Sequence, residues 1–267
     1  MDSLPGDLTD QLVGIIEAIA KGNYLQDIIE LTKPGQPETI CRIAEAVGLM
    51  MVKIEAREYR LEQLVEELRE LNERLKKNII NSVTTMANAL AARDEYTEGH
   101  AVRVADYAQR IARRLGLPEN EVNHIRLGGI LHDIGKISFP DALFEARGIP
   151  LTDDLLSSIK VHPENGVTIL RDLDFLGPIV EFVHYHHERF DGQGYPKGLT
   201  GKEIPLGARI ISVADCFDAM TTDRPYQKGT SYAEGLEILK KISGSQLDPE
   251  VVLAFVEEIT QNGVSKE

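Results

Sequence analysis

HDIGK at residues 132–136 and HHERFDGQGYP at residues 186–196 are the stretches that decide how this chain is interpreted. Each stretch places two side chains of the metal-ligand type next to each other, His132 beside Asp133 and His186 beside His187. Neighbouring side chains on a helix point at different angles, so one of a pair can bind an ion while the other reaches a second ion. A lone histidine on a helix is more often an ordinary polar residue, but these adjacent pairs indicate a metal site.

The chemistry of such a site follows from its ligands. Hydrolysis of a phosphodiester near neutral pH needs a hydroxide, groups that bind the non-bridging oxygens and stabilisation of the leaving group, and two metal ions supply all three. Imidazoles and carboxylates suit iron, manganese or zinc. Neither stretch contains a cysteine, which argues against a closed structural zinc site.

The composition narrows the class of protein. A formal net charge of −14 argues against a basic surface for DNA, RNA or anionic lipid. The two cysteines, Cys41 and Cys216, are far apart, as expected of reduced thiols in the cytoplasm. We expect a cytoplasmic protein without a membrane span or signal peptide, because no stretch reaches the ~18 apolar residues of a span and no basic segment opens the chain.

Apolar residues at helical spacing dominate the sequence and strand signals are scarce, so it predicts an all-α fold. Within residues 1–55 we expect a helix over 5–21, a connector over 23–36 and a second helix from Pro37. This pattern, with Gly22-Asn23-Tyr24 after the first helix and Pro37-Glu38-Thr39-Ile40 at the second, resembles a HAMP signalling module. A plain helical hairpin is the alternative.

Residues 56–82 are predicted to form a coiled-coil linker helix. The apolar positions follow alternating steps of three and four, a stripe too narrow to cover a globular core. Arg57 occupies the one seam position that is not apolar, and the spacing changes after residue 75. We expect a parallel homodimer through these N-terminal helices; the alternative is a helix that packs on its own domain. The seam consists of Val47, Met50, Ile54, Leu61, Leu64, Leu68, Leu71 and Leu75.

Residues 83–267 are predicted to form one large helical domain. Asp248 and Pro249 predict the start of its last helix, and Gly244 predicts the end of the preceding one. The HDIGK stretch resembles the signature of HD-domain phosphohydrolases. The stretch over 186–196 resembles the second signature that marks HD-GYP phosphodiesterases, and the similarity extends from Val83 to the end of the chain.

This resemblance implies a set of metal ligands, with Asp133 as the carboxylate that bridges two ions. It implies two divalent ions, with iron or manganese favoured. A third ion is less favoured, because Tyr96 stands where some members have a glutamate, although Glu95 or Glu98 could approach. A degenerate, metal-free fold is the alternative. The implied ligands are His100, His132, Asp133, His162, His186, His187 and Asp215.

The resemblance also implies contacts with the substrate. Lys136 would act beside Asp133 in catalysis by contacting a phosphate oxygen or the hydroxide, and an ordinary ion pair with Asp133 is the alternative. Arg224 would bind a phosphate or a guanine. Gly194 and Tyr195 are counted with the substrate-binding residues. They lie in a turn-rich loop that would shape the site and contact a signalling protein. His124 is interpreted as structural, and His184 as a surface or ligand-orienting residue.

The function implied is metal-dependent hydrolysis of cyclic di-GMP to linear pGpG, with GMP as a further product, by a metal-bound hydroxide. The N-terminal module would regulate it. Two alternatives remain: a related hydrolase that acts on another cyclic dinucleotide or nucleotide, and a cyclic di-GMP sensor that binds without turnover. The native metal, the input signal and the protein partners do not follow from the sequence.

Overall fold

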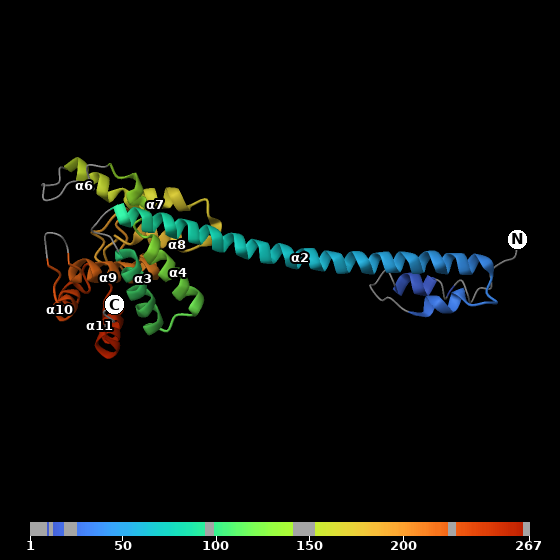
Figure 1. Ribbon diagram of the computed structural model, residues 1–267. Coiled ribbons are helices and arrows are strands. Elements are labelled where there is room, and N and C mark those ends of the chain that lie inside the picture. The colour runs from blue at the N-terminus through green and yellow to red at the C-terminus, as the bar shows by residue number, and fades with distance from the viewer. Residues whose placement is uncertain are drawn as a thin grey trace. The chain divides into compact units, whose positions relative to one another are not determined.

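The computed structural model describes residues 10, 13–18, 26–93, 99–140, 153–223 and 228–263 (Figure 1). The chain divides into two compact units, Met1–Leu75 and Lys76–Glu267. Within the described ranges the regular elements are helices, and strand-like pairing is limited to isolated bridges such as that between Asp191 and Thr200. The predicted all-α fold is confirmed.

The first unit contains a helical segment at residues 13–18, the 3-10 helix η1 (Gln26–Thr32) and the beginning of α2 (Glu38–Arg93). The helix predicted to open at Pro37 is therefore confirmed. The 3-10 helix within the connector was not predicted, because its residues carry no strong helical signal. The similarity to a HAMP module stays a prediction. The buried core of this unit consists of Ile15, Ile28, Leu31, Ile40, Ala44, Val47 and Met51.

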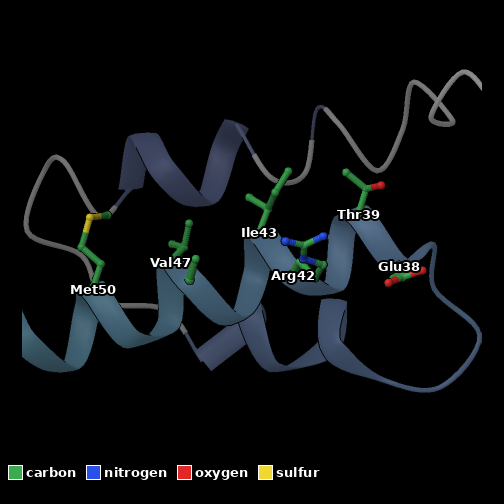
Figure 2. A pocket seen from close by; sticks show the side chains of 7 residues that line it. Glu38, Thr39, Arg42, Ile43, Val47 and Met50 are labelled. Carbon is green, nitrogen blue, oxygen red and sulfur yellow. The ribbon is translucent and has the colours of Figure 1, made fainter. Parts of the chain in front are cut away.

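An open groove lies along the start of α2 (Figure 2). Its lining mixes charged with apolar side chains, and Met50 is 45% exposed there. Farther along α2, the leucines at positions 61, 64, 68, 71 and 75 are all exposed, between 44% and 66%. The groove is lined by Glu38, Thr39, Arg42, Ile43, Ala46, Val47 and Met50.

The second unit contains the helices that carry the two signature stretches. Its main core forms where α3, α4, α9 and α11 pack together. Rings from three of these helices meet edge to face, with centroids 5.4 Å apart for Tyr107 and Phe217 and 4.8 Å apart for Phe217 and Phe255. The elements are α3 (His100–Arg114), α4 (Glu119–Leu131), η2 (Ile134–Ser138), α6 (Asp153–Lys160), α7 (His162–Leu170), η3 (Asp174–Leu176), α8 (Ile179–Tyr185), η4 (Gly201–Glu203), α9 (Leu206–Thr221), α10 (Tyr232–Ile242) and α11 (Pro249–Asn262).

A second cluster holds the elements that carry the signature residues. Leu131 of α4, Ile134 of η2, Leu170 of α7 and Val183 of α8 are all buried in it, together with Ala87 near the end of α2. Because Leu131 and Ile134 flank residues 132 and 133, and Val183 lies three positions before residue 186, burial of these apolar side chains also fixes the positions of the signature side chains.

The predicted helix boundaries of this unit are confirmed where the structure describes them. The carboxylate of Asp248 accepts a hydrogen bond from the amide of Glu250 at 2.8 Å and caps α11, with Pro249 in the first turn. Helix α10 ends at Ile242, and Gly244 adopts a positive φ of 81°. Among the described residues, no helix combines the length and the apolar character that a membrane crossing requires.

Candidate metal centre

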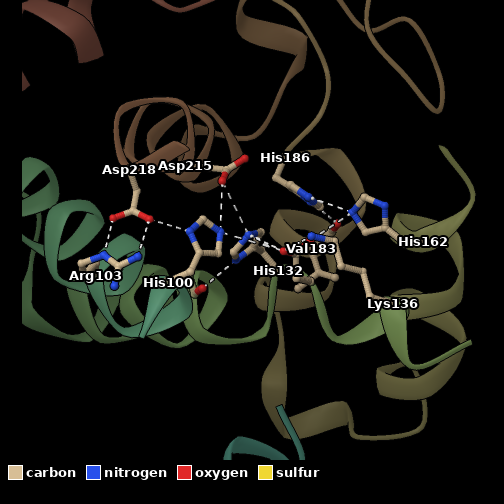
Figure 3. Close-up of polar contacts among 11 residues, drawn as sticks. His100, Arg103, His132, Lys136, His162, Val183, His186, Asp215 and Asp218 are labelled. Carbon is tan, nitrogen blue, oxygen red and sulfur yellow. Dashed lines mark hydrogen bonds and ion pairs between the residues drawn. The ribbon is translucent and has the colours of Figure 1, made fainter. Parts of the chain in front are cut away.

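The seven predicted ligands lie in or directly beside five helices and form three overlapping groups of potential ligands. Figure 3 shows five of them, His100, His132, His162, His186 and Asp215, around one centre. His100 and His162 are the first residues of α3 and α7, and His132 is the C-terminal cap of α4. His186 caps the C-terminal end of α8, and Asp215 lies within α9. Side chains from distant parts of the chain therefore converge.

One half of the centre lies between α3, α4 and α9. The Nε2 atom of His100 is 3.2 Å from the Oδ1 atom of Asp215, and the Nε2 atom of His132 is 4.0 Å from the same oxygen. These three side chains offer ligand atoms within 4.8 Å of one another, which is close enough for one ion.

The other half consists of His162, His186 and His187, which form a second group by the same criterion. The rings of His162 and His186 are buried, and their Nε2 atoms face each other at 3.2 Å. The ring centroid of His187 lies 5.0 Å from that of His162. Three imidazoles thus share one small volume.

Asp133 lies between the two halves. Its Oδ2 atom is 3.3 Å from the Nε2 atom of His132 and 4.0 Å from that of His100, while its Oδ1 atom is 3.4 Å from the Nε2 atom of His162. One carboxylate therefore faces both groups with different oxygens. This is the position that a bridging ligand would need.

Backbone carbonyls orient three of the histidines. The Nδ1 atoms of His132, His162 and His186 lie 2.7–2.8 Å from the carbonyl oxygens of residues 129, 159 and 183, each three positions earlier. A carbonyl oxygen can only accept a hydrogen bond, so each Nδ1 carries a proton and, in the neutral imidazole, each Nε2 keeps its lone pair. The lone pairs therefore point into the centre, as metal ligands require.

The charges suit the binding of a cation. Burial lowers the pKa of His162, lowers that of His187 to about 4 and holds that of His186 well below its usual value. These imidazoles are therefore neutral near neutral pH. Burial alone would raise the pKa of Asp133, but His132 and Lys136 hold it well below its usual range.

His100 differs from the other histidines. Burial disfavours its charged form, yet hydrogen bonds to Asp215 and Asp218 outweigh burial and raise the pKa of His100 to about 10. Burial likewise would raise the pKa of Asp215, but the hydrogen bond with His100 helps to keep it below its usual value. The carboxylates around His100 thus favour a positive charge at this end of the centre.

Lys136 reaches the centre from η2. Its Nζ atom lies 2.5 Å from the Oδ2 atom of Asp133, and its side chain is 25% exposed. The ion pair that was the alternative for this lysine is present in the structure. Contact with a phosphate oxygen stays a prediction, and the partial exposure of Lys136 leaves it accessible to a substrate.

The loop after the second signature packs against the centre. The ring of Tyr195 stacks on that of His187, with centroids 4.9 Å apart and planes 28° apart. Gly194 has no room for a side chain, because a Cβ atom there would lie 2.6 Å from the Cα atom of Glu188. Asp191 stabilises the loop, since its Oδ1 atom accepts a hydrogen bond from the amide of Gln193 at 3.1 Å.

Two acidic residues near the centre were missed in the sequence. The buried carboxylate of Glu188 accepts hydrogen bonds from the amides of Lys197, Gly198 and Leu199 at 2.6–3.1 Å, so it anchors the loop next to His187. Asp218 contacts His100. Its position three residues after Asp215, on the same face of a helix, was the one available signal.

Other predicted residues lie away from the centre or outside the described ranges. His184 stacks on Tyr185, with ring centroids 4.4 Å apart, and belongs to none of the groups of potential ligands among the described residues. Arg224, and Tyr96 with its neighbours Glu95 and Glu98, lie outside the described residues. The phosphate contact of Arg224 and the number of ions remain predictions.

Comparison with known proteins agrees with this geometry. A cyclic di-GMP phosphodiesterase of Pseudomonas aeruginosa, PA4108, is 41% identical over 171 residues, which cover 64% of this chain and 41% of the relative. The response regulator RpfG of Xanthomonas campestris, also named a cyclic di-GMP phosphodiesterase, is 32% identical over 245 residues, 91% of this chain and 64% of the relative. The chain thus spans less than two thirds of the length of either relative.

A crystal structure of a cyclic GMP-AMP-specific phosphodiesterase from Vibrio cholerae shares the fold, with a TM-score of 0.56 and 20% identity. The match covers 68% of this chain and 49% of that one. The HD domain family matches residues 84–251, which include all seven candidate ligands. This chain belongs to the HD domain family.

Proposed function

We propose that this chain is a metal-dependent phosphodiesterase that hydrolyses cyclic di-GMP to linear pGpG. The observation that carries the proposal is the pair of Nε2 atoms of His162 and His186, which face each other at 3.2 Å in a buried site. Because both Nδ1 atoms donate to carbonyls, both facing nitrogens are acceptors. A cation between them relieves this repulsion. The names of the two sequence relatives support cyclic di-GMP as the substrate.

The donor set fits two divalent ions. His100, His132 and Asp215 would hold one ion, and the three histidines at 162, 186 and 187 would hold the other. Asp133 would contact both ions with its two oxygens. Imidazoles with carboxylates and no thiolate suit iron, manganese or zinc. The resemblance to HD-GYP phosphodiesterases favours iron or manganese among these. When bound, such ions make water nucleophilic and stabilise charge on the phosphate oxygens.

The chain's own residues would position the substrate. Lys136, partly exposed beside Asp133, would bind a non-bridging phosphate oxygen and stabilise the charge that develops there. Tyr195 would define the wall of the site next to His187, and Gly194 would permit the close turn that places it there. We also propose that Arg224 contacts a phosphate or a guanine of the substrate. We further propose a cytoplasmic location and a signalling protein that binds the loop over 191–196.

Turnover experiments decide between this function and its alternatives. The metal-free protein is reconstituted with Mn²⁺, or with Fe²⁺ without air, and given cyclic di-GMP, the hybrid cyclic GMP-AMP and a simple nucleotide in parallel. We expect linear pGpG from cyclic di-GMP, no turnover with a chelator present, and recovery when Mn²⁺ is restored. Faster cleavage of the hybrid dinucleotide would transfer the proposal to that substrate, as the Vibrio cholerae structure suggests. Tight binding without cleavage would favour the sensor.

We further propose that α2 pairs with α2 of a second copy in a parallel dimer and that the N-terminal unit regulates the enzyme. The support is the exposed stripe of leucines on α2, together with Met50 in the groove at the start of the same helix. The leucines repeat every three or four residues, the spacing of a coiled-coil seam. Burying them against the same stripe of a second copy would remove a large apolar area from water.

Charges placed in this seam should separate the dimer. We expect the double variant Leu64→Glu, Leu68→Glu to be a monomer by light scattering at concentrations where the natural chain is a dimer, because four carboxylates would meet in one apolar interface. The matched control is Glu66→Gln with Glu67→Gln, which changes exposed flanking positions. A double leucine variant with the mass of the natural dimer would show that the copies associate elsewhere.

A further inference from the structure

We propose that Asp218, held by Arg103, is the positioning residue that directs the Nε2 atom of His100 into the metal centre. The inference rests on the proposed function, because it concerns a ligand of that centre. It assigns the orientation of His100 to a buried aspartate and an arginine, and both residues lie outside the two signature stretches. Figure 3 shows the side chains of Arg103, Asp218 and His100 in a row on one side of the centre, with Asp215 beside His100.

The Nδ1 atom of His100 contacts a side chain, whereas the Nδ1 atoms of His132, His162 and His186 contact backbone carbonyls. His162 also opens a helix, but α6 runs almost directly into α7, so the carbonyl of Ile159 is available to its Nδ1 atom. His100 instead follows Gly99, which has a positive φ of 71° and no side-chain cap. The Nδ1 atom of His100 is 2.7 Å from the Oδ2 atom of Asp218, so a carboxylate takes the place of the carbonyl.

The carboxylate is itself rigidly held. Arg103 donates from Nε to Oδ1 of Asp218 at 2.6 Å and from Nη2 to Oδ2 at 3.0 Å, a two-pronged pair that fixes the plane of the carboxylate. The side chain of Asp218 is only 2% exposed. Gly99 leaves the space for the guanidinium, since a Cβ atom there would lie 2.9 Å from the Nη1 atom of Arg103.

This arrangement determines which nitrogen of His100 can bind a metal. The Asp218 carboxylate only accepts, so Nδ1 of His100 donates to it, and Nε2, 3.2 Å from Asp215, is the nitrogen left for an ion, which would displace the proton there. A carboxylate partner also makes the imidazole a stronger ligand than a carbonyl partner does. Asp215 and Asp218 lie three residues apart on α9. One helix therefore supplies both the candidate ligand Asp215 and the residue that orients the second candidate ligand, His100.

Mn²⁺ binding tests the inference without relying on activity. The free ion is counted by its paramagnetic resonance during titration of the metal-free full-length protein. For Asp218→Asn we expect one of the two ions to bind about 10–100-fold more weakly, and the ion at His162, His186 and His187 to bind as before, because only His100 loses its charged partner. Asp172→Asn, which removes one exposed carboxylate, is the matched control and should bind both ions normally.

Two further measurements separate the possible failures. Thermal unfolding of the metal-free variant shows whether Asp218→Asn still folds. If it does not, Arg103→Gln tests the contact between Arg103 and Asp218 from a more exposed residue, and it should weaken binding of the same ion. Equal weakening of both ions would point to a general structural role and overturn the inference, as would unchanged binding of both ions. A natural chain that binds neither Mn²⁺ nor Fe²⁺ would instead refute the proposed function.

Discussion

The Asp133→Ala variant is expected to lose hydrolysis of cyclic di-GMP, with kcat lower by about a thousandfold or more, equivalent to about 4 kcal/mol of transition-state stabilisation. The reason is the place of Asp133 between the two groups of ligands. Its two oxygens face His132 and His162 at 3.3 Å and 3.4 Å, one oxygen toward each group. Alanine would therefore weaken both ions at once and leave Lys136 without its carboxylate partner.

The measurement is kcat under saturating Mn²⁺, with the metal content of the same sample determined in parallel. Asp172→Ala is the matched control, because its side chain is 89% exposed and it should keep both activity and metal. Activity within tenfold of the natural chain would mean that Asp133 does not link the ions. Loss of activity with full metal content would assign to Asp133 a role in the chemical step rather than in metal binding.

Gly135→Ala is expected to lower the free energy of unfolding by at least about 2 kcal/mol, since extra atoms in a packed interior force the backbone to move. A Cβ atom at position 135 would overlap the carbonyl oxygen of His162 and lie 2.6 Å from the amide nitrogen of Gly166. Both neighbours are backbone atoms of α7, so a change of rotamer cannot relieve the overlap. Separation of η2 from α7 would also move Asp133 away from His162, and turnover should fall together with stability.

Chemical unfolding of the metal-free protein measures this effect, so that metal loss is not counted as instability. Gly48→Ala is the matched control. It lies within α2 with nothing inside 4 Å of its Cβ position, and alanine there should stabilise the helix by up to about 1 kcal/mol. A Gly135→Ala variant as stable as the natural chain would show that η2 and α7 can separate without cost.

Local chemistry explains which features could be predicted. The end of α10 before Gly244 and the cap of α11 at Asp248 depend on residues that are neighbours in the chain, so their signals are visible in the sequence. The all-α fold follows from apolar periodicity for the same reason. Four candidate ligands stand out because they form two adjacent pairs, and the resemblance to HD-GYP phosphodiesterases implied His100, His162 and Asp215. The structure brings all seven together.

The supporting residues could not be predicted in this way. Glu188 and Asp218 are ordinary acidic residues in the sequence, and their partners lie 9–11 and 115–118 positions away. Whether Lys136 meets Asp133 or solvent likewise depends on how η2 lies against the centre. Such roles are set by distances between elements, which no local pattern records.

The amino-acid sequence by itself determined the all-α fold, the end of α10, the start of α11 and the two adjacent pairs of ligand-type residues, because these depend on intrinsic side-chain chemistry and on neighbours within a turn or two. Only the tertiary structure decided that Asp133 faces both groups, that the Nε2 atoms of His162 and His186 meet at 3.2 Å, and that Asp218 holds His100. The physical reason is that packing of two apolar clusters brings helix ends together from distant parts of the chain, and hydrogen-bond geometry then selects which nitrogen of each imidazole points inward.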